Sequence, residues 1–167
     1  KRAEMFVNRL NKNLKKIEKW ANKQNIQCYR VYDADMPEYS VAIDRYGDWV
    51  HVQEYAAPKT VDELSAENRF QEVLSVLPSV MQVDKKRIIT KQRSRQKGRA
   101  QYEKQAAVGR KYAVTEHDCS LMVNFTDYLD VGLFLDHRPI RKWIQDHAQG
   151  KRFLNLFCYT GAATVHA

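Results

Sequence analysis

A concentrated run of positive charge divides this sequence and limits which parts of it can form a core. Residues 85–111, which we call the basic segment, contain eleven lysine and arginine residues and one acidic residue. The formal net charge of the whole chain is +8, so this segment carries all of the excess and the remainder is nearly balanced. Gly98 and the surrounding polar residues predict an exposed loop. The core must therefore form from the residues on either side.

The basic segment also predicts a partner. A stripe of positive charge on an otherwise balanced surface is typical of a site for a polyanion, because each neutralised phosphate releases counterions. Tyr102 adds an aromatic ring of the kind that stacks on a base. The alternative is a solvated loop without a ligand. The candidate RNA-contacting residues are Lys91, Arg93, Arg95, Lys97, Arg99, Tyr102 and Lys104.

The first part of the chain predicts one long helix. Over residues 3–24, apolar residues recur at spacings of three and four, which places them on one helix face. The opposite face is rich in lysine and contacts either RNA or solvent. We treat residues 1–25 as an N-terminal basic amphipathic helix. Its inward residues are Phe6, Leu10, Leu14, Ile17 and Ala21.

The next part predicts strands followed by a helix. Residues 28–32, 39–44 and 49–55 are rich in Val, Ile, Tyr and Trp, and the turn at 46–48 joins the last two into a hairpin. Thr60 and Glu63 have the spacing of a capping box, so a helix should follow. Pro78 should end or bend that helix. Its inward residues are Leu64, Phe70, Val73, Leu74 and Leu77.

Three further strands are predicted beyond this helix. Residues 87–91 lead into the basic segment, and residues 112–115 and 121–125 form a strand pair. We predict an α+β fold, with a small strand-strand-helix-strand-strand domain over residues 26–130 that contacts RNA.

Residues 131–167 predict the start of a second domain. Asp136 should cap a helix over 137–147, with Pro139 in its first turn and Gly150 after its end. The apolar run 153–158 is typical of a buried parallel strand, and a turn at Gly161 leads into a helix. This arrangement is the cofactor corner of Rossmann-like domains, although an ordinary strand-to-helix connection gives the same pattern.

Specific motifs favour the cofactor corner. The sequence NLFCYTGAATVHA at the C-terminal end resembles the first cofactor-binding motif of class I methyltransferases that modify ribosomal RNA, and GLFLDHRPIR resembles the segment that precedes it in those enzymes. DRYGDWVHVQEYAAPKT, RQKGRAQYEK and LMVNFTDYLDVGLFLDHR extend the resemblance over nearly the whole chain. It is strongest to the bifunctional guanine methyltransferases of 23S ribosomal RNA.

The resemblance implies a cofactor and its site. S-adenosyl-L-methionine is expected at the end of the 153–158 strand, in the first part of a truncated class I methyltransferase domain. The generic motif has an acidic residue where this chain has Asn155 and a glycine where it has Tyr159, and both departures weaken the generic argument. The residues implied to hold the cofactor are Asn155, Phe157, Tyr159, Gly161, Asp136 and Arg138.

The resemblance also implies a reaction. This half of the intact enzyme would methylate N7 of a guanine in 23S rRNA, and the other half would methylate N2 of a second guanine. The residues that hold the cofactor ribose and line the target base in the family would follow Ala167. We therefore expect this chain alone to contribute RNA binding without catalysis, and we nominate no catalytic residue in it.

Two other functions fit the sequence. A related family of rRNA methyltransferases shares the accessory domain and modifies C5 of cytosine, commonly through a cysteine nucleophile in a later motif. The chain could also be a non-catalytic RNA-binding module whose last strand is structural. The residues that follow Ala167 and a cofactor titration of the longer protein separate these alternatives.

Composition limits the remaining choices. The three cysteines and five histidines lack metal-ligand spacing, so we expect no metal and buried free thiols. No apolar run approaches the roughly 18 residues of a membrane span, and no signal peptide opens the chain. We expect a cytoplasmic protein. The chain lacks an initial methionine and ends in an apolar run, so we expect it to be part of a longer protein.

Overall fold

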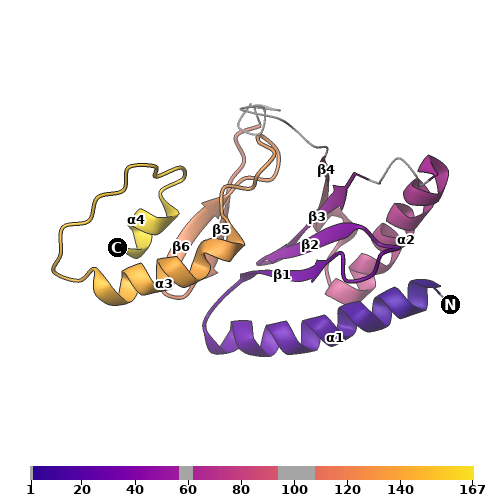
Figure 1. Ribbon diagram of the computed structural model, residues 1–167, viewed down its shortest axis with the longest axis horizontal. Coiled ribbons are helices and arrows are strands. Elements are labelled where there is room, and N and C mark those ends of the chain that lie inside the picture. The colour runs from indigo at the N-terminus through magenta and orange to yellow at the C-terminus, as the bar shows by residue number, and fades with distance from the viewer. Residues whose placement is uncertain (1, 57–61, 94–107) are drawn as a thin grey trace.

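The computed structural model describes residues 2–56, 62–93 and 108–167. A four-stranded sheet is flanked by two long helices, and a separate hairpin stands between this sheet and two shorter helices (Figure 1). The elements around the sheet are α1 (Arg2–Lys23), β1 (Cys28–Asp33), β2 (Val41–Tyr46), β3 (Trp49–Tyr55), α2 (Glu63–Met81), η1 (Lys85–Arg87) and β4 (Ile88–Arg93). The remaining elements are β5 (Tyr112–Glu116), β6 (Cys119–Val123), η3 (Leu135–His137), α3 (Arg138–His147) and α4 (Ala162–His166).

The larger sheet has the strand order β1-β2-β3-β4. The first three strands are antiparallel, and β2 joins β3 through a tight turn in which Tyr46 pairs with Trp49. β4 is parallel to β3, with Val50 opposite Ile88, because α2 carries the chain back to the same end of the sheet. This crossover places the first residues of the basic segment, 85–93, in η1 and in the edge strand β4.

One core joins the helices to both sheets. The predicted α1 is confirmed, and Phe6 packs its ring against Tyr32 at 5.1 Å and against Tyr39 at 4.7 Å between centroids. Val73 and Leu77 of α2 are fully buried in the same cluster. The cluster continues into the second hairpin and the loop after it through Val114, Leu121, Val123, Phe125, Val131 and Leu133.

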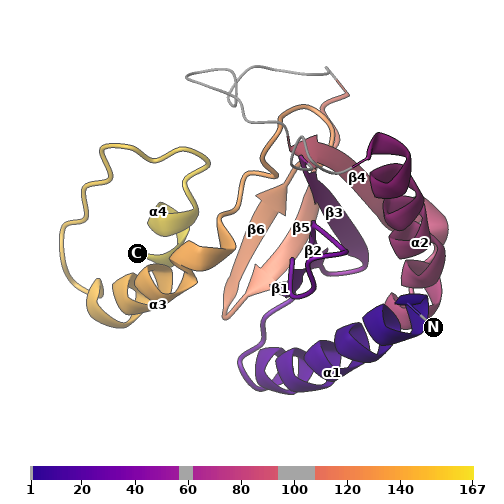
Figure 2. The ribbon, with the colours of Figure 1, turned by 45° about the vertical axis from the view of Figure 1, so that its right-hand side comes forward.

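The β5–β6 hairpin is attached to the start of β1. The backbone N–H of Gln27 donates to the carbonyl of Thr115 at 2.9 Å, and Ile26 forms an isolated bridge with Glu116. Figure 2 shows the hairpin between the larger sheet and the pair α3 and α4. The hairpin therefore connects the two parts of the molecule.

Several local predictions around α2 need correction. The N-cap of α2 is Asp62, whose carboxylate accepts from the backbone N–H of Ser65 at 2.9 Å, so the predicted capping box is wrong. Leu64, predicted to face inward, is 70% exposed because the helix starts at Glu63 and its first turn lies outside the core. The helix continues past Pro78 to Met81, since burial of Met81 offsets the one backbone hydrogen bond that proline removes.

The strand order also differs from the prediction. Among the described residues, three strands precede α2 and three follow it, so the predicted strand-strand-helix-strand-strand order has too few strands. The last two strands form their own sheet instead of extending the first. Within residues 26–130, the segments predicted as strands were correct within two residues, but their pairing depends on contacts between distant segments.

The C-terminal prediction fails at two points. Residues 153–158 form no strand, and the side chains of Leu154 and Phe157 are 77% and 94% exposed. A buried parallel strand needs neighbours on both sides, and no described strand pairs with this segment. Asp136 caps no helix, because the preceding 3₁₀ turn already starts at Leu135. Pro139 lies in the first turn of α3, as predicted.

The described residues limit what else the chain can hold. None of the described helices is long and apolar enough to cross a membrane. Within residues 2–56, 62–93 and 108–167, no group of three or more His, Cys, Asp or Glu side chains is arranged to hold a metal ion.

Cys28 is buried as predicted, but Cys158 is exposed because the strand predicted to bury it does not form.

The packing of α1 leads to a stability prediction. Leu10 is fully buried, so Leu10→Ala should lower the free energy of unfolding by about 2–5 kcal/mol through reduced apolar burial and a residual cavity. Met5 lies on the same helix and is 59% exposed, so Met5→Ala is a matched control that should change little. Urea titrations of both variants measure the difference, and equal effects would contradict this placement of α1.

Candidate functional site

A cavity of about 870 Å³ lies where β6, the loop after it and the turn before α4 meet. Its walls come from three parts of the chain that are distant in sequence. Gly109 and Lys111 belong to the basic segment, and Tyr159 and Thr160 belong to the turn predicted to hold the cofactor. The third part, between them, supplies Met122, Asp127, Asp130 and Gly132. The cavity therefore adjoins both predicted sites.

The turn before α4 is held by its own backbone and by the loop opposite. The N–H of Gly161 donates to the carbonyl of Cys158 at 2.6 Å, and the hydroxyl of Thr160 donates to the carbonyl of Gly132 at 2.7 Å. Gly161 has φ +79°, but a Cβ there would meet no atom within 4 Å. Backbone conformation, not lack of space, therefore favours glycine at this position in this chain.

Gly132 is restricted in a different way. A Cβ at Gly132 would lie 3.1 Å from Cγ2 of Thr160, and its φ is +92°. A Cβ at Gly132 would require Thr160 to shift slightly, and the positive φ strains any other residue, so both effects favour glycine where the loop meets the turn.

The residues predicted to hold the cofactor are only partly brought together. The ring of Tyr159 stacks on Phe134 with centroids 5.3 Å apart, next to Gly161. The Nδ2 of Asn155 donates to the hydroxyl of Thr164 in α4 at 3.0 Å. Phe157 and Asp136 are exposed to solvent. Among the predicted residues, only Tyr159 lines the cavity, and Gly161 lies between its lining residues Thr160 and Ala162.

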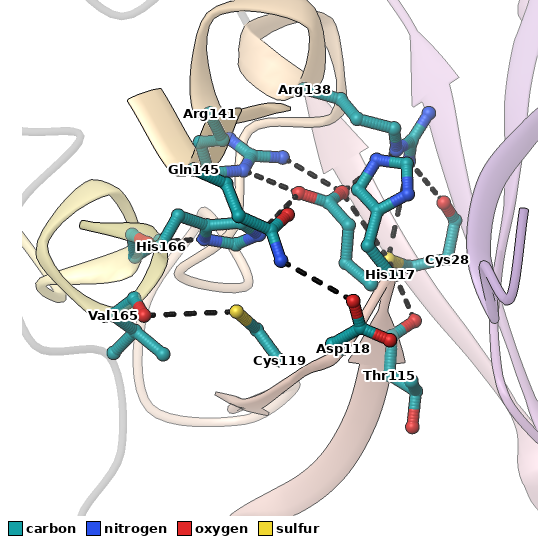
Figure 3. Close-up of polar contacts among 12 residues, drawn as sticks. Cys28, Thr115, His117, Asp118, Cys119, Arg138, Arg141, Gln145, Val165 and His166 are labelled. Carbon is teal, nitrogen blue, oxygen red and sulfur yellow. Dashed lines mark hydrogen bonds and ion pairs between the residues drawn. The ribbon is translucent and has the colours of Figure 1, made fainter. Parts of the chain in front are cut away.

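Arg138, also predicted for the cofactor, is engaged elsewhere. Its Nε donates to Oε2 of Glu116 at 2.7 Å, and its Nη2 contacts the backbone carbonyl of Cys28. Its guanidinium carbon lies 5.4 Å from the ring centre of Trp20. Figure 3 shows the side chain pointing from α3 toward β1. In this structure Arg138 connects α3 to the larger sheet and to α1.

Glu116 is the centre of this group. Arg141 donates to the same carboxylate through Nε at 2.5 Å and through Nη2 at 3.0 Å, and its Nη1 donates to the carbonyl of Phe134 at 2.8 Å. Nε2 of His166 in α4 lies 3.5 Å from Oε1 of Glu116. Glu116, Arg141 and His166 are all buried. One carboxylate thus ties β5 to α3 and α4.

The environment of Glu116 determines its charge. Burial alone would raise the pKa of this carboxyl, but the hydrogen bonds and positive charges of Arg141 and Arg138 outweigh burial and lower the pKa. In contrast, burial and the nearby Glu116 carboxylate raise the pKa of the Cys28 thiol to about 11. The carboxylate is therefore ionised and the thiol protonated near neutral pH, so Cys28 is a poor nucleophile.

The sequence contained one signal for this group. Arg138 and Arg141 are three residues apart on the predicted helix, which places them on one face. Nothing in the sequence marked Glu116, because an acidic residue next to a predicted turn is ordinarily exposed.

The predicted RNA-contacting residues lie mostly outside the described part of the chain. Arg95, Lys97, Arg99, Tyr102 and Lys104 are not among the described residues. Arg93 is the last residue of β4. Lys91 is partly buried, and its ammonium group donates to the carbonyls of Tyr128 and Leu129.

Comparison with known proteins identifies a family and several relatives. Residues 36–167 match the model of the S-adenosylmethionine-dependent methyltransferase family. Proteins named ribosomal RNA large subunit methyltransferase K/L are similar along 99% of this chain: 65% identical in Marinobacter nauticus, 61% in Pseudomonas fluorescens and 59% in Marinomonas sp.. The chain spans less than a quarter of the length of these relatives, 22–23%.

Solved structures share the fold. A candidate methyltransferase crystallised in complex with SAH superposes with a TM-score of 0.73 at 24% identity, over 99% of this chain and 41% of its own. A candidate SAM-dependent methyltransferase from Streptococcus mutans gives the same TM-score and identity, over 42% of its length.

The lowered pKa of Glu116 leads to a pH prediction. A carboxyl with a lowered pKa in the folded state adds stability above its ordinary value, which is 4.5, and this contribution disappears as the pH falls through the lowered value. Glu116→Gln should lower the free energy of unfolding at pH 7 by about 3–5 kcal/mol, because both arginines lose their buried counter-charge.

The same variant should show a flatter fall in stability below pH 4.5, because the group that titrates there is gone. Urea titrations of wild type and variant over a pH series measure both effects. Asp118→Asn removes one charge from an exposed position two residues away and is the matched control. Equal stability of Glu116→Gln and wild type at pH 7 would show that the carboxylate is not needed to join the elements.

Proposed function

We propose, because this chain belongs to the S-adenosylmethionine-dependent methyltransferase family, that it is the RNA-contacting part and the start of the cofactor domain of a 23S ribosomal RNA methyltransferase. The observation that carries the proposal is its 57–65% identity, over 99% of its length, to proteins named as large-subunit rRNA methyltransferases. The net positive charge of the basic segment supports the choice of a polyanionic substrate. We expect this activity in the cytoplasm, where ribosomal RNA is found.

The cavity supports a cofactor site at the turn before α4. Tyr159 and Thr160 line it, and Gly161 gives the turn a backbone conformation that larger residues rarely adopt. Asn155 contacts Thr164 of α4, and Phe157 and Asp136 are exposed, so all three side chains carry polar or aromatic groups that an adenosine or amino-acid moiety could use. We propose that these residues form one wall of the S-adenosylmethionine site. Arg138 stabilises the position of this wall indirectly, through its hydrogen bond to Glu116.

We propose guanine N7 as the atom that this part of the enzyme methylates. The cofactor supplies a methyl group on a positively charged sulfur. Guanine N7 would form a bond to this methyl group with its free lone pair as the carbon–sulfur bond breaks and a neutral thioether leaves. No proton is lost, so alignment alone can provide most of the rate enhancement. No general base is required of this chain. The target guanine must be unpaired, because the deep major groove of an RNA helix hides N7. The other half of the intact protein would methylate guanine N2.

The first test concerns Gly161 in the full-length protein. Gly161→Val should abolish methylation of 23S rRNA, because valine rarely adopts φ +79° and the turn at the cofactor site would change. Gly150 has φ +72° with equally open surroundings and lies outside the turn before α4, so Gly150→Val is the matched control. Methyl transfer, RNA affinity and thermal stability are measured for both variants.

The expected result is that Gly161→Val loses methylation with RNA affinity nearly intact, while Gly150→Val loses only stability. Wild-type methylation by Gly161→Val would remove this turn from the cofactor site. Mapping the methylated base in the wild-type product separates guanine N7 from cytosine C5, and the absence of any methylated product would favour a non-catalytic RNA-binding module.

The second test concerns the basic segment. Replacing Arg93, Arg95, Lys97 and Arg99 with alanine should weaken binding to ribosomal RNA and flatten its salt dependence by about 0.7–0.9 log–log units for each phosphate that the variant no longer neutralises. The control removes four lysines from α1, namely Lys12, Lys15, Lys16 and Lys19, and so changes the net charge equally. An unchanged slope in the first variant, measured by filter binding over a salt series, would exclude the segment as the RNA site.

A further inference from the structure

A buried aspartate accepts hydrogen bonds from the backbone that directly follows residues 94–107, the centre of the basic segment. Asp127, 3% exposed, accepts hydrogen bonds from the backbone N–H of Val108 at 3.0 Å and of Gly109 at 2.9 Å. Asn124 and Thr126 of the same turn also donate to this carboxylate, each at 3.0 Å. Val108 and Gly109 are the first described residues after 94–107. The aspartate therefore fixes one flank of that stretch.

A lysine on the other flank reaches the same turn. Lys91, three residues before the stretch 94–107, donates its ammonium protons to the carbonyls of Tyr128 and Leu129. Burial lowers the pKa of the Lys91 ammonium group, and the negative charges of Asp130 and Asp127 oppose part of this effect. Both flanks of the stretch 94–107 are thus held to residues 124–130.

The charge of Asp127 is stable in this environment. Burial alone would raise the pKa of its carboxyl, but hydrogen bonds from Asn124, Thr126, Gly109 and Val108 outweigh burial and lower the pKa. An ionised aspartate close to a polyanion site opposes RNA binding by charge. Its four hydrogen bonds indicate a different role, which is to organise the backbone.

We propose that residues 124–130 form a clamp that fixes both flanks of residues 94–107, the centre of the basic segment, and that Asp127 and Lys91 are positioning residues, not RNA ligands. The proposal rests on the proposed RNA-binding function of the segment and adds a part to it. Fixing the flanks before RNA arrives lowers the conformational entropy that binding would otherwise remove. Lys91 is therefore no longer expected to contact phosphate.

The clamp also relates the RNA site to the cofactor turn. Asp127, Tyr128 and Asp130 line the same cavity as Tyr159 and Thr160. The clamp and the turn are joined through the loop between them, since Thr160 donates to the carbonyl of Gly132. The two flanks of residues 94–107 are therefore connected, through this loop, to the turn proposed for the methyl donor.

Two aspartates in the clamp allow a test, because charge alone and the clamp predict opposite changes in RNA affinity for Asp127→Asn. Asp127→Asn and Asp130→Asn remove the same charge from the same turn, but only the Asp127 carboxylate accepts hydrogen bonds from the flank at Val108 and Gly109. If charge alone mattered, both changes would strengthen RNA binding. The clamp predicts that Asp127→Asn binds RNA several-fold more weakly than wild type and more weakly than Asp130→Asn, which keeps the hydrogen bonds to Val108 and Gly109.

The measurement is RNA affinity of the full-length protein over a salt series. Asp127→Asn should also flatten the salt dependence, because misplaced flanks reduce the number of phosphates contacted, whereas a simple loss of folded protein would lower the active fraction and leave the slope unchanged. Asp127→Glu keeps the charge and changes the geometry, so it should weaken binding too and provides a second variant if Asp127→Asn folds poorly.

The outcomes separate the clamp from the function on which it rests. If Asp127→Asn and Asp127→Glu bind RNA with wild-type affinity and slope while the alanine variant of Arg93, Arg95, Lys97 and Arg99 binds weakly, the clamp is wrong and the RNA site stands. If that alanine variant also binds normally, the RNA-binding function itself fails. Weaker binding by both Asp127 variants than by Asp130→Asn and wild type supports the clamp.

Discussion

The carboxylate of Glu116 joins β5 to α3 and lies next to α4. It accepts from Arg138 and Arg141 of α3 and faces His166 of α4, and Arg138 continues to the backbone of Cys28 (Figure 3). A buried ion group of this kind is not a large source of net stability, because desolvation of the charges cancels much of their attraction. Its main effect is to fix the relative positions of these elements, because any arrangement that separates the partners leaves a buried charge without an opposite charge.

The two proposed sites depend on that geometry. The cofactor turn lies between α4 and the loop at Gly132, and the clamp lies at the other end of the same loop. β6 forms the wall between them, and its position is set by the pairing of β5 with β6 and by the bridge from Ile26 to Glu116. The hairpin therefore joins part of the basic segment, proposed to contact RNA, and the turn proposed to hold the cofactor, and both line one cavity.

Predictions from local patterns were accurate where one element decides its own structure. The apolar spacing in residues 3–24 correctly predicted α1, and the turn residues at 46–48 correctly predicted the β2–β3 hairpin. The cap of α2 was misplaced by two residues, since Asp62 competes with Thr60 for the same role and only the path of the chain decides between them. The strand prediction for residues 153–158, which are mostly exposed, failed because a buried parallel strand forms only beside neighbouring strands. The local sequence does not show whether such neighbours are present.

By itself, the sequence determined the mixed helix and strand content, the concentration of charge in residues 85–111 and the family resemblance carried by its motifs. These properties belong to composition, periodicity and short patterns, which are local. Tertiary structure alone decided that Glu116 meets two arginines from α3, and that Asp127 and Lys91 hold the flanks of the basic segment to one turn. Such pairings join residues far apart in the chain, and no local pattern specifies them, because their energy arises only when burial removes competing water.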